Sequence, residues 1–387
     1  ALAPLHFSVA DAAHLPDLPR LLAEHPHILL TGPPDSSDSG KAPGLSLETF
    51  AALLEQTAGL RPTILIEADG SRMRPFKAPA AHEPVVPPQT THLVTVVGAD
   101  VVGQPLTESH VHRAELAADL IGAQLGAAVT AQWVADVLAH PSGGLKGWRP
   151  GMRASALINK ADTPERERAG REIAAHLMAA AGFDSAVLAV AKSNDPAREA
   201  FGRVSGGVLA AGEGKRFGGP KQLAELAGKP LVRHVVEAGL AAGLAEVVVV
   251  TGSAGEQVEA ALAGTPARAA FNSDWAAGQS TSVRAGLAAL SPHSEAAVFL
   301  LADQPLVSAE LIRALVTAHR RTLAPLVAPR HEGRRGNPVL FDRAVWPELL
   351  ALTGDTGGRP LFERYAAEIA WVEADERIFW DVDTAQD

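Results

Sequence analysis

A glycine-rich loop directly after a short aliphatic run does most to limit what this chain can fold into. The segment Gly207–Leu223 reads GVLAAGEGKRFGGPKQL, with glycines at positions 212, 214, 218 and 219. Glycines let a backbone approach a ligand closely, and successive N–H groups in such a turn form a concavity for an anion. A strand followed by such a loop is typical of an open α/β sheet. The sequence therefore predicts an α/β fold with a phosphate-bearing ligand at this turn.

Three cations distinguish this loop from the dinucleotide and P-loop motifs. Lys215, Arg216 and Lys221 lie in the loop, Phe217 occupies the place of the third glycine of G-x-G-x-x-G, and no Gly-Lys-Ser/Thr follows. A triphosphate whose pyrophosphate must leave needs cations to neutralise the charge that develops. We expect Arg216 and Lys221 to hold the β- and γ-phosphates and to act in catalysis. The alternative is a basic surface turn.

Five later segments continue the pattern in the same order. They are Asn272–Gly286 (NSDWAAGQSTSVRAG), Leu300–Pro305 (LLADQP), Gly336–Val339 (GNPV), Gly354–Arg359 (GDTGGR) and Asp381–Thr384 (DVDT). Together with the glycine-rich loop, they resemble the motifs of MobA-like nucleotidyltransferases, in particular the molybdenum cofactor cytidylyltransferases. The resemblance extends over most of the second half and implies a Rossmann-like, GT-A type nucleotidyltransferase fold there.

This resemblance implies roles for individual residues. It places a nucleoside triphosphate, CTP or alternatively GTP, against Leu209, Ala210, Ala211, Gly212, Gly214, Lys215, Gly218, Gly278, Ser280 and Ser282. It places the acceptor, the phosphate end of molybdopterin (the molybdenum cofactor), near Asn337, Asp355 and Arg359. Helix capping by the serines and a surface turn around Asp355 are the alternatives. The close cytidylyltransferases more often have His where this chain has Asn337, which leaves the acceptor open.

Asp303 is the expected ligand of a Mg²⁺ ion. It follows the apolar run Ala297–Leu301, and ligands gather at the carboxyl ends of strands in open α/β sheets. Mg²⁺ binds through one or two carboxylates together with substrate phosphates. The expected second metal ligand is Asp383, in the D-x-D-T motif. The alternatives are an ordinary helix cap for Asp303 and an acidic chain end for Asp383.

The resemblance thus implies nucleotidyl transfer. The acceptor's terminal phosphate attacks the α-phosphorus, pyrophosphate leaves in line, and the protein contributes positioning and neutralisation of charge. A nucleotidyltransferase for another small phosphate, such as a sugar phosphate, would use the same loop chemistry. The alternative outside enzymes is a carrier or insertion chaperone that binds the molybdenum cofactor without turnover.

The N-terminal half has nucleotide-binding patterns but no phosphate loop. Thr63–Asp69 (TILIEAD) predicts a strand that ends in acids, as in a Walker B motif, and Asn159–Asp162 (NKAD) fits the N-K-x-D pattern that holds guanine. Gly32–Lys41 (GPPDSSDSGK) has the wrong spacing for a phosphate loop, and Ala42 replaces the Ser or Thr. A plain helix start at Pro164 is the alternative for N-K-x-D. The missing loop disfavours a GTPase.

A second resemblance covers roughly residues 28–200. Glu67–Pro87 (EADGSRMRPFKAPAAHEPVVP) is similar to the YqeC-like accessory family of selenium-dependent hydroxylases, which shares E-A-D-G-x-x-x-x-P-x-K-A-P-x-x-x-E-P. It implies a P-loop-NTPase-like domain lacking its phosphate loop, which either lies upstream of Ala1 or has been lost. The candidate site residues of this domain are Asp69, Lys77, Glu83, Asn159, Lys160 and Asp162. A proline-stiffened loop held by salt bridges is the alternative for the first three.

Aliphatic runs that alternate with helix-forming stretches predict two wound, three-layer α/β domains. The expected strands are Ile28–Thr31, Thr63–Glu67, Leu93–Val97, Ala156–Ile158, Ala186–Val190, Gly207–Ala210, Glu246–Thr251, Ala297–Leu301 and Leu326–Ala328. The expected helices include Arg113–Leu125, Pro164–Ala181 and Leu231–Ala242. The polar segment Ala191–Ser205 is the expected boundary, which gives a YqeC-like domain over residues 1–200 and a MobA-like domain over 205–387.

Composition narrows the function further. The 387 residues contain no Cys, which excludes a disulfide scaffold, an iron–sulfur cluster and thiol catalysis. The net charge of −10 argues against nonspecific binding of nucleic acid. No apolar stretch approaches the ~20 residues of a membrane span, and the N-terminus has no basic signal-peptide region. We expect a cytoplasmic protein acting on small molecules, with a molybdenum hydroxylase apoenzyme as the candidate protein partner.

Overall fold

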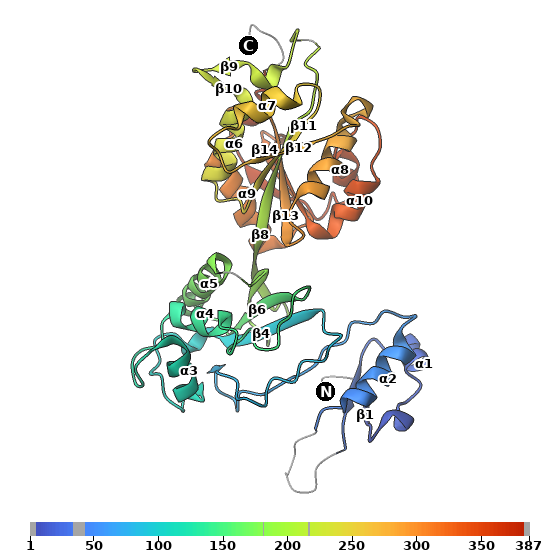
Figure 1. Cartoon of the computed structure of the whole chain (residues 1–387), viewed down its shortest axis with the longest axis vertical. Helices are drawn as coiled ribbons and strands as arrows, with labels where there is room; N and C mark the ends of the chain where they lie inside the picture. Colours follow the sequence, from blue (N-terminus) through green and yellow to red (C-terminus); the bar gives the residue numbers. More distant parts are fainter. Residues whose placement is uncertain (1–4, 34–42, 181, 216, 383–387) are drawn as a thin grey trace. The chain divides into compact units, whose positions relative to one another are not determined.

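The computed structural model describes residues 5–33, 43–180, 182–215 and 217–382 (Figure 1). The chain forms two compact units, residues 1–73 with 80–90 and residues 74–79 with 91–387. The first unit has a parallel pair of strands, β1 (Leu5–Ser8) and β2 (Ile28–Thr31), and two helices, α1 (Leu18–Glu24) and α2 (Leu47–Thr57). Ser46 caps α2, since its hydroxyl accepts a hydrogen bond of 3.0 Å from the Thr49 N–H.

The expected strand Thr63–Glu67 is not formed. Residues 61–71 have no regular secondary structure, and Leu65 is 91% exposed. A strand needs a hydrogen-bonded neighbour, and among the described residues of this unit β2 pairs with β1 alone. The prediction of a Walker B strand in this segment is therefore wrong for this structure.

The second unit is built on a sheet of eleven strands. In its N-terminal part, β4, β6 and β7 are parallel neighbours, and β7 pairs antiparallel with the first residues of β8. The elements of this part are β3 (Phe76–Lys77), β4 (His92–Gly98), β5 (Val111–His112), β6 (Arg153–Asn159), β7 (Ser185–Ala189), β8 (Ala197–Ala210), α3 (Ala114–Ile121), α4 (Ala131–Ala139) and α5 (Pro164–Ala179). Pro164 opens α5, and Thr163 caps it through the Arg166 N–H.

In the C-terminal part, β8 continues between β11 and β13, both of which run parallel to it. The sheet continues on either side, with β12 beside β11, with β16 and then β14 beyond β13, and with β15 and β17 paired to β14. The strands β9 and β10 form a separate antiparallel pair. The strands are β9 (Glu225–Leu226), β10 (Lys229–Pro230), β11 (Val247–Thr251), β12 (Arg268–Phe271), β13 (Ser294–Leu301), β14 (Leu326–His331), β15 (Arg334–Arg335), β16 (Val339–Asp342) and β17 (Ala370–Glu373).

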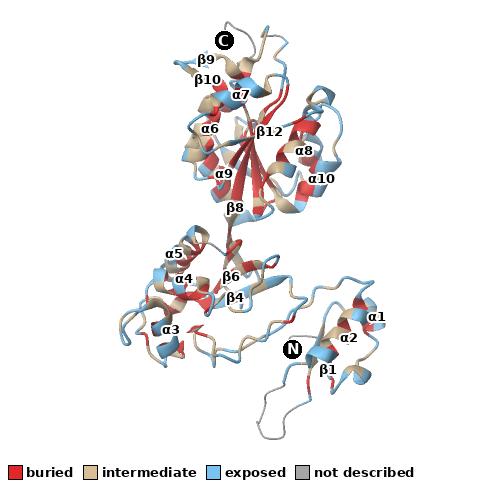
Figure 2. Ribbon diagram, in the orientation of Figure 1, coloured by how far each residue is buried: buried red, intermediate tan, exposed pale blue. Residues whose placement is uncertain are grey.

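Helices cover both faces of this part of the sheet, which gives three layers (Figure 1). Apolar residues of α6 and α9 pack on one face and those of α8 and α10 on the other, and the central strands between them are buried (Figure 2). The helices are α6 (Leu231–Ala241), α7 (Gly255–Ala261), α8 (Gln279–Ala289), α9 (Ala309–Thr322), α10 (Trp346–Ala351) and α11 (Arg359–Arg364). The all-apolar strands predicted a sheet covered on both faces, and β11, which is buried throughout, confirms it.

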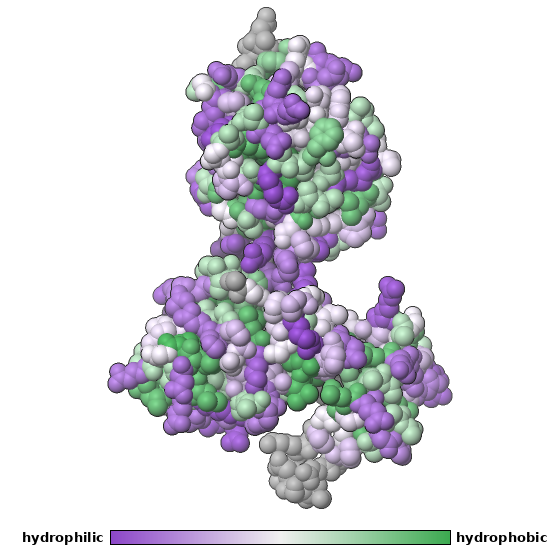
Figure 3. Space-filling model, viewed as in Figure 1, coloured by the Kyte–Doolittle hydropathy of each residue, from purple (hydrophilic) through white to green (hydrophobic). Residues whose placement is uncertain are grey.

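The remaining expected strands and helices are each present, with small shifts of their ends. The exception is β8, which begins at Ala197 rather than at the expected Gly207. The helix α3 ends at Ile121 rather than Leu125 because Gly122 adopts a left-handed conformation with φ of 65°. The fold class is α/β, as predicted. Figure 3 shows hydrophilic and apolar residues interspersed over the exposed face of the C-terminal part. Among the described residues, no helix is both long and apolar enough to span a bilayer.

The expected boundary segment, residues 191–205, includes the first half of β8. This strand is 14 residues long, and its residues contribute to two separate clusters of buried apolar side chains. Phe201 belongs to the cluster of the N-terminal part and Val204 to the first cluster of the C-terminal part. The division into domains at this point stays a prediction.

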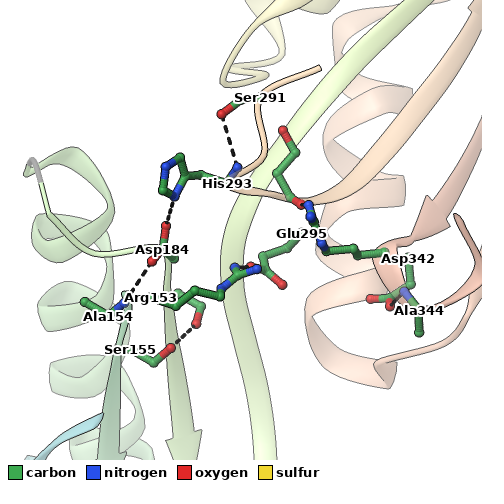
Figure 4. A network of polar contacts seen from close by, with 12 residues as sticks. Arg153, Ala154, Ser155, Asp184, Ser291, His293, Glu295, Asp342 and Ala344 are labelled. Atoms are coloured by element: carbon green, nitrogen blue, oxygen red, sulfur yellow. Dashed lines mark hydrogen bonds and ion pairs between the residues drawn. The ribbon is translucent and has the colours of Figure 1, made fainter. Parts of the chain in front are cut away.

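A polar network surrounds this strand where the two parts of the sheet meet (Figure 4). One carboxylate oxygen of Asp184 accepts a hydrogen bond of 2.8 Å from the Ala154 N–H, and the other lies 2.5 Å from His293 Nδ1. Arg153 and Glu295 form an ion pair in the same network. The Asp184 side chain is only 7% exposed, so it links β6, the approach to β7 and the approach to β13 in a largely dry setting.

We predict that Asp184→Ala destabilises the protein by about 2 kcal/mol, because it leaves the buried Ala154 N–H without its acceptor. The midpoint of urea unfolding, followed by tryptophan fluorescence, measures the effect. Asp195→Ala, at an exposed position, is the matched control and should leave the midpoint unchanged. Equal midpoints for the two variants would show that the network contributes nothing to stability.

Candidate active site

A cavity of about 590 Å³ opens at the carboxyl ends of the parallel strands of the C-terminal part. Its walls come from the end of β8 and its glycine-rich loop, from the start of α8, and from the end of β13. The residues that line it are Leu209 to Lys215, Lys221, Gln222, Trp275 to Gln279, Ser282, Leu301, Ala302, Asp303 and Asp355. Its size falls within the range of about 300–1,000 Å³ that is usual for small-molecule sites.

The glycine-rich loop makes a turn that only glycine fits at position 214. Gly214 has φ of 68°, and a Cβ there would lie 1.9 Å from the carbonyl oxygen of Gly219. The Gly214 carbonyl in turn accepts hydrogen bonds from the N–H groups of Phe217 and Gly218, at 2.9 and 3.1 Å. The loop therefore folds back on itself as a compact turn.

The carbonyl groups at the start of the loop are bound from behind. Gln222 is buried, and its side-chain amide donates to the carbonyls of Ala210 and Gly212 at 3.1 and 3.2 Å. The Ser253 hydroxyl donates to the same Gly212 carbonyl at 3.3 Å. These contacts fix the backbone path along the cavity wall, which is the preorganisation that a phosphate-binding loop requires.

An ion pair between Lys221 and Asp303 lies at the base of the cavity. Lys221 comes from the short 3-10 helix Lys221–Leu223 after the loop, and Asp303 lies just beyond the end of β13 at Leu301. The two side chains are 24% and 16% exposed, so they are shielded from solvent but still reach the cavity. The Asp303 carbonyl also accepts a hydrogen bond of 3.0 Å from the Val382 N–H.

The wall opposite the loop is the start of α8. Gly278 has φ of 113°, and a Cβ on it would lie 2.6 Å from the Gly354 carbonyl oxygen. That carbonyl accepts from the Ser280 N–H at 3.2 Å, and the Asp355 carboxylate accepts from the Gln279 N–H at 3.1 Å. The Gly354–Arg359 loop is thereby held against the cavity wall, although the two segments lie far apart in the sequence.

The possible metal ligands among the described residues fit a magnesium ion that binds mainly through substrate phosphates. Among the described residues, no group of three or more His, Asp or Glu side chains is arranged for a metal ion. Asp303 nevertheless offers one carboxylate beside the glycine-rich loop, and Mg²⁺ often takes only one or two protein carboxylates. Its present partner Lys221 is a flexible side chain that could instead contact a phosphate.

The structure brings together most of the predicted nucleotide-binding residues. Leu209, Ala210, Ala211, Gly212, Gly214, Lys215, Gly278, Ser282, Lys221 and Asp303 all line the cavity, and so does Asp355, which was predicted to meet the acceptor. Gly218 lines a neighbouring hollow that shares Glu213 and Lys215 with the cavity. Ser280 is 1% exposed, and its hydroxyl has no hydrogen-bond partner among the described residues. The predicted Arg216 and Asp383 lie outside the described residues.

The other candidates lie elsewhere. Asn337 and Arg359 are not among the lining residues. In the N-terminal part, Lys160 forms an ion pair of 2.8 Å with Asp100, and Asp162 forms one of 2.6 Å with Arg166 in the next helical turn. The Arg166 guanidinium lowers the pKa of the Asp162 carboxyl.

The remaining N-terminal candidates serve local backbone contacts or fall in separate units. The Asn159 amide oxygen accepts from the N–H groups of Lys160 and Ala191. Asp69 and Glu83 belong to the first compact unit and Lys77, in β3, to the second. A site formed by these residues stays a prediction.

Several lining residues were not predicted individually, and two of them, Gln222 and Trp275, stand out by their chemistry. Gln222 supports the loop through its carbonyls, and Trp275 supplies the one large aromatic ring in the described cavity wall. Both lie inside motifs that the sequence displays, P-K-Q-L and N-x-x-W. The sequence signals that could have identified these two residues were an amide beside a glycine-rich loop and a lone aromatic ring before a helix.

Comparisons with known proteins support the predicted family of each half of the chain. Residues 206–369 match the family described as MobA-like NTP transferase domain, and residues 18–115 match the family described as YqeC protein. The chain is 34% identical over 192 residues to nicotine blue oxidoreductase of Paenarthrobacter nicotinovorans, which covers 47% of this chain and 93% of that protein.

Two further relatives cover smaller or less similar regions. The chain is 32% identical over 157 residues to the uncharacterized protein YqeC of Escherichia coli, covering 38% of this chain. It spans only 59% of the length of that relative. Among solved structures, Rv0371c of Mycobacterium tuberculosis H37Rv is 28% identical, with a TM-score of 0.43 over 48% of this chain and 94% of that one.

We predict that Gly214→Ala lowers the thermal unfolding midpoint well below that of a matched glycine variant. Gly243→Ala is the match, because Gly243 also has positive φ, at 82°, but has open space where a Cβ would be. Both changes cost about 1–2 kcal/mol of backbone strain, and only Gly214→Ala adds the clash with the Gly219 carbonyl. Equal midpoints would contradict the tight turn.

Proposed function

Residues 206–369 belong to the MobA-like NTP transferase family, and on that premise we propose that the protein transfers CMP from CTP to the terminal phosphate of molybdopterin, with release of pyrophosphate. The proposed domains are a YqeC-like domain over residues 1–200 and the transferase domain over 205–387. The observation that carries the proposal is the ion pair of Lys221 and Asp303 beside the glycine-rich loop. A cation that can contact the leaving pyrophosphate, and an acid that can hold a metal ion beside it, are what pyrophosphate departure needs.

The chain's own residues supply positioning and charge. In this proposal the Gly212–Gly214 turn receives the triphosphate, and Lys221 moves from Asp303 to a β- or γ-phosphate oxygen. Asp303 would then hold Mg²⁺, which neutralises charge on the phosphate oxygens when it is bound. Arg216, whose placement is not described, is proposed as a second cation for the leaving pyrophosphate. Asp383 is proposed as the second metal ligand.

The opposite wall is suited to a nucleoside. Trp275 offers a flat apolar surface, and the neighbouring start of α8 offers polar groups at Ser282 and Gln279. A base stacked on Trp275 would place its ribose toward α8 and its α-phosphate toward the glycine-rich loop. Asn337, Asp355 and Arg359 are proposed to meet the acceptor, and Asp355 already reaches the cavity.

Two other functions share part of this geometry. A nucleotidyltransferase for another small phosphate, with GTP or a sugar phosphate, uses the same loop. A carrier for the molybdenum cofactor needs the cavity but not the Lys221–Asp303 pair, so this pair favours turnover. The Paenarthrobacter relative is named as an oxidoreductase. A nicotinamide or flavin nucleotide also carries phosphates. Reduction of a dye by NADH is therefore the negative control, and the proposal predicts no such reduction.

We predict that purified full-length protein with Mg²⁺ releases pyrophosphate from CTP only when molybdopterin is present, and more slowly from GTP and ATP. A coupled pyrophosphate assay measures the three rates. Pyrophosphate release that needs no acceptor phosphate, or none with any nucleotide, would contradict the proposal. In the second case, tight binding of the cytidylylated cofactor would support the carrier instead.

A further prediction concerns Asp303 itself. Asp303→Asn keeps the shape of the side chain but removes the charge, and it should lower kcat by at least about 100-fold. Asp136→Asn, on the surface of α4, is the matched control and should keep full activity. CTP binding by calorimetry without metal should be retained or strengthened in Asp303→Asn, because the nucleoside wall is intact and Lys221 no longer has to leave a charged partner. Full activity of Asp303→Asn with Mg²⁺ would overturn the assignment.

A further inference from the structure

Two arginines outside the cavity, Arg335 and Arg359, lie on the two motifs that the sequence assigned to the acceptor. Arg335 is the last residue of β15 and precedes Gly336-Asn337-Pro338. Arg359 is the last residue of the Gly354–Arg359 loop and the first of α11. Both residues are exposed. The positions of Arg335 and Arg359 in the sequence did not predict that the two residues act together.

The Arg335 side chain is held in place by an aromatic ring. Its guanidinium carbon lies 3.9 Å from the centroid of the Phe362 ring, which belongs to α11 together with Arg359. Successive residues of a strand point to opposite faces, and Arg334 accordingly lies over a different ring, that of Phe379, at 4.6 Å. The stacking fixes the Arg335 guanidinium on the α11 side.

The charges of the two arginines are not compensated within the described chain. Desolvation, followed by the positive charge of Arg359, lowers the pKa of the Arg335 side chain. The described residues include no carboxylate within ion-pair distance of Arg335 or Arg359, whereas nearby Arg330 is paired with Glu373 at 2.6 Å. Arg335 lies over α11, the helix that Arg359 begins, and an anion that contacts both guanidinium groups would compensate their charges.

The loop that ends at Arg359 also forms part of the cavity wall. Its first residues are anchored to α8 by the hydrogen bonds of Gly354 and Asp355, and Asp355 lines the cavity. Gly357 lies against the Gln279 side chain, and Gly358 against Phe341. The path from the cavity to Arg359 is therefore a short loop that contacts α8 and β16, and Arg335 lies over the helix that follows it.

We propose that Arg335 and Arg359 form an anion site that holds a phosphate monoester of the acceptor next to the nucleotide cavity. Two guanidinium groups can donate hydrogen bonds to several phosphate oxygens at once, which a single cation does less well. In its link to an acceptor, this inference rests on the proposed function. The site itself is a property of the described residues, and Arg335 was not among the residues that the sequence motifs suggested.

Binding of inorganic phosphate to the full-length protein tests the site directly. We compare Arg335→Gln and Arg359→Gln with Arg334→Gln, which removes the same charge and a similar stacking contact from the same hairpin. The line width of the phosphate ³¹P resonance during titration reports the affinity. Phosphate can also enter the nucleotide cavity, but the three variants share that cavity unchanged, so differences between them report on the arginine pair.

We expect Arg335→Gln and Arg359→Gln each to weaken phosphate binding about tenfold relative to Arg334→Gln. The double variant should lose little more phosphate affinity than either single variant, since each single substitution already removes the same site. Arg335→Lys should recover part of the affinity, because it keeps the charge. Equal affinities for Arg335→Gln and Arg334→Gln would overturn the proposal, and so would an unchanged affinity in the double variant.

Steady-state kinetics separates this proposal from the proposed function. With molybdopterin as acceptor, Arg335→Gln should raise the KM for molybdopterin about tenfold and leave the KM for CTP unchanged. If no variant transfers a nucleotide but phosphate binding still depends on Arg335, the proposed function fails and the anion site stands. If transfer occurs with wild-type KM values in Arg335→Gln, the anion site is rejected and the proposed function stands.

Discussion

The candidate site depends on one ion pair, between Lys221 and Asp303. It ties the segment after the glycine-rich loop to the end of β13, at the edge where β8, β11 and β13 all end. Burial of both side chains excludes much of the water that would screen their attraction. In the proposed function this pair separates, because a triphosphate would contact Lys221 and a metal ion would bind Asp303. This contact thus joins the proposed chemistry to the end of β13, while the turn of the loop itself is held by the Gly214 carbonyl and by Gln222.

The fold makes this contact possible by placing rigid elements on three sides. β8 is buried between β11 and β13, and helices pack on both faces of the sheet. The loop after β8 is fixed by Gln222 from behind, and the start of α8 is fixed by Gly354 and Asp355. These supports are hydrogen bonds between side-chain and backbone groups together with close glycine contacts, and they hold the cavity wall in position.

The sequence predicted the fold class, eight of its nine tested strands and most of the cavity wall, because all of these follow from local patterns. An aliphatic run becomes a buried strand only where another strand lies beside it to form hydrogen bonds. Thr63–Glu67 does not form a strand, because the pattern of a segment does not specify its neighbour in the sheet. The pairing of Lys221 with Asp303 and the approach of Arg335 to α11 join residues distant in sequence. Such contacts depend on sheet order and loop packing, which local patterns do not specify.

The most direct measurement is a crystal structure of the full-length protein with CTP and Mg²⁺. The account predicts the triphosphate along Gly212–Lys221, the base against Trp275, the metal ion on Asp303, and Lys221 moved to a phosphate oxygen. Nucleotide bound at Asn159–Asp162 with the Lys221–Asp303 pair intact would contradict it. So would nucleotide in the cavity with its phosphates pointing away from the glycine-rich loop.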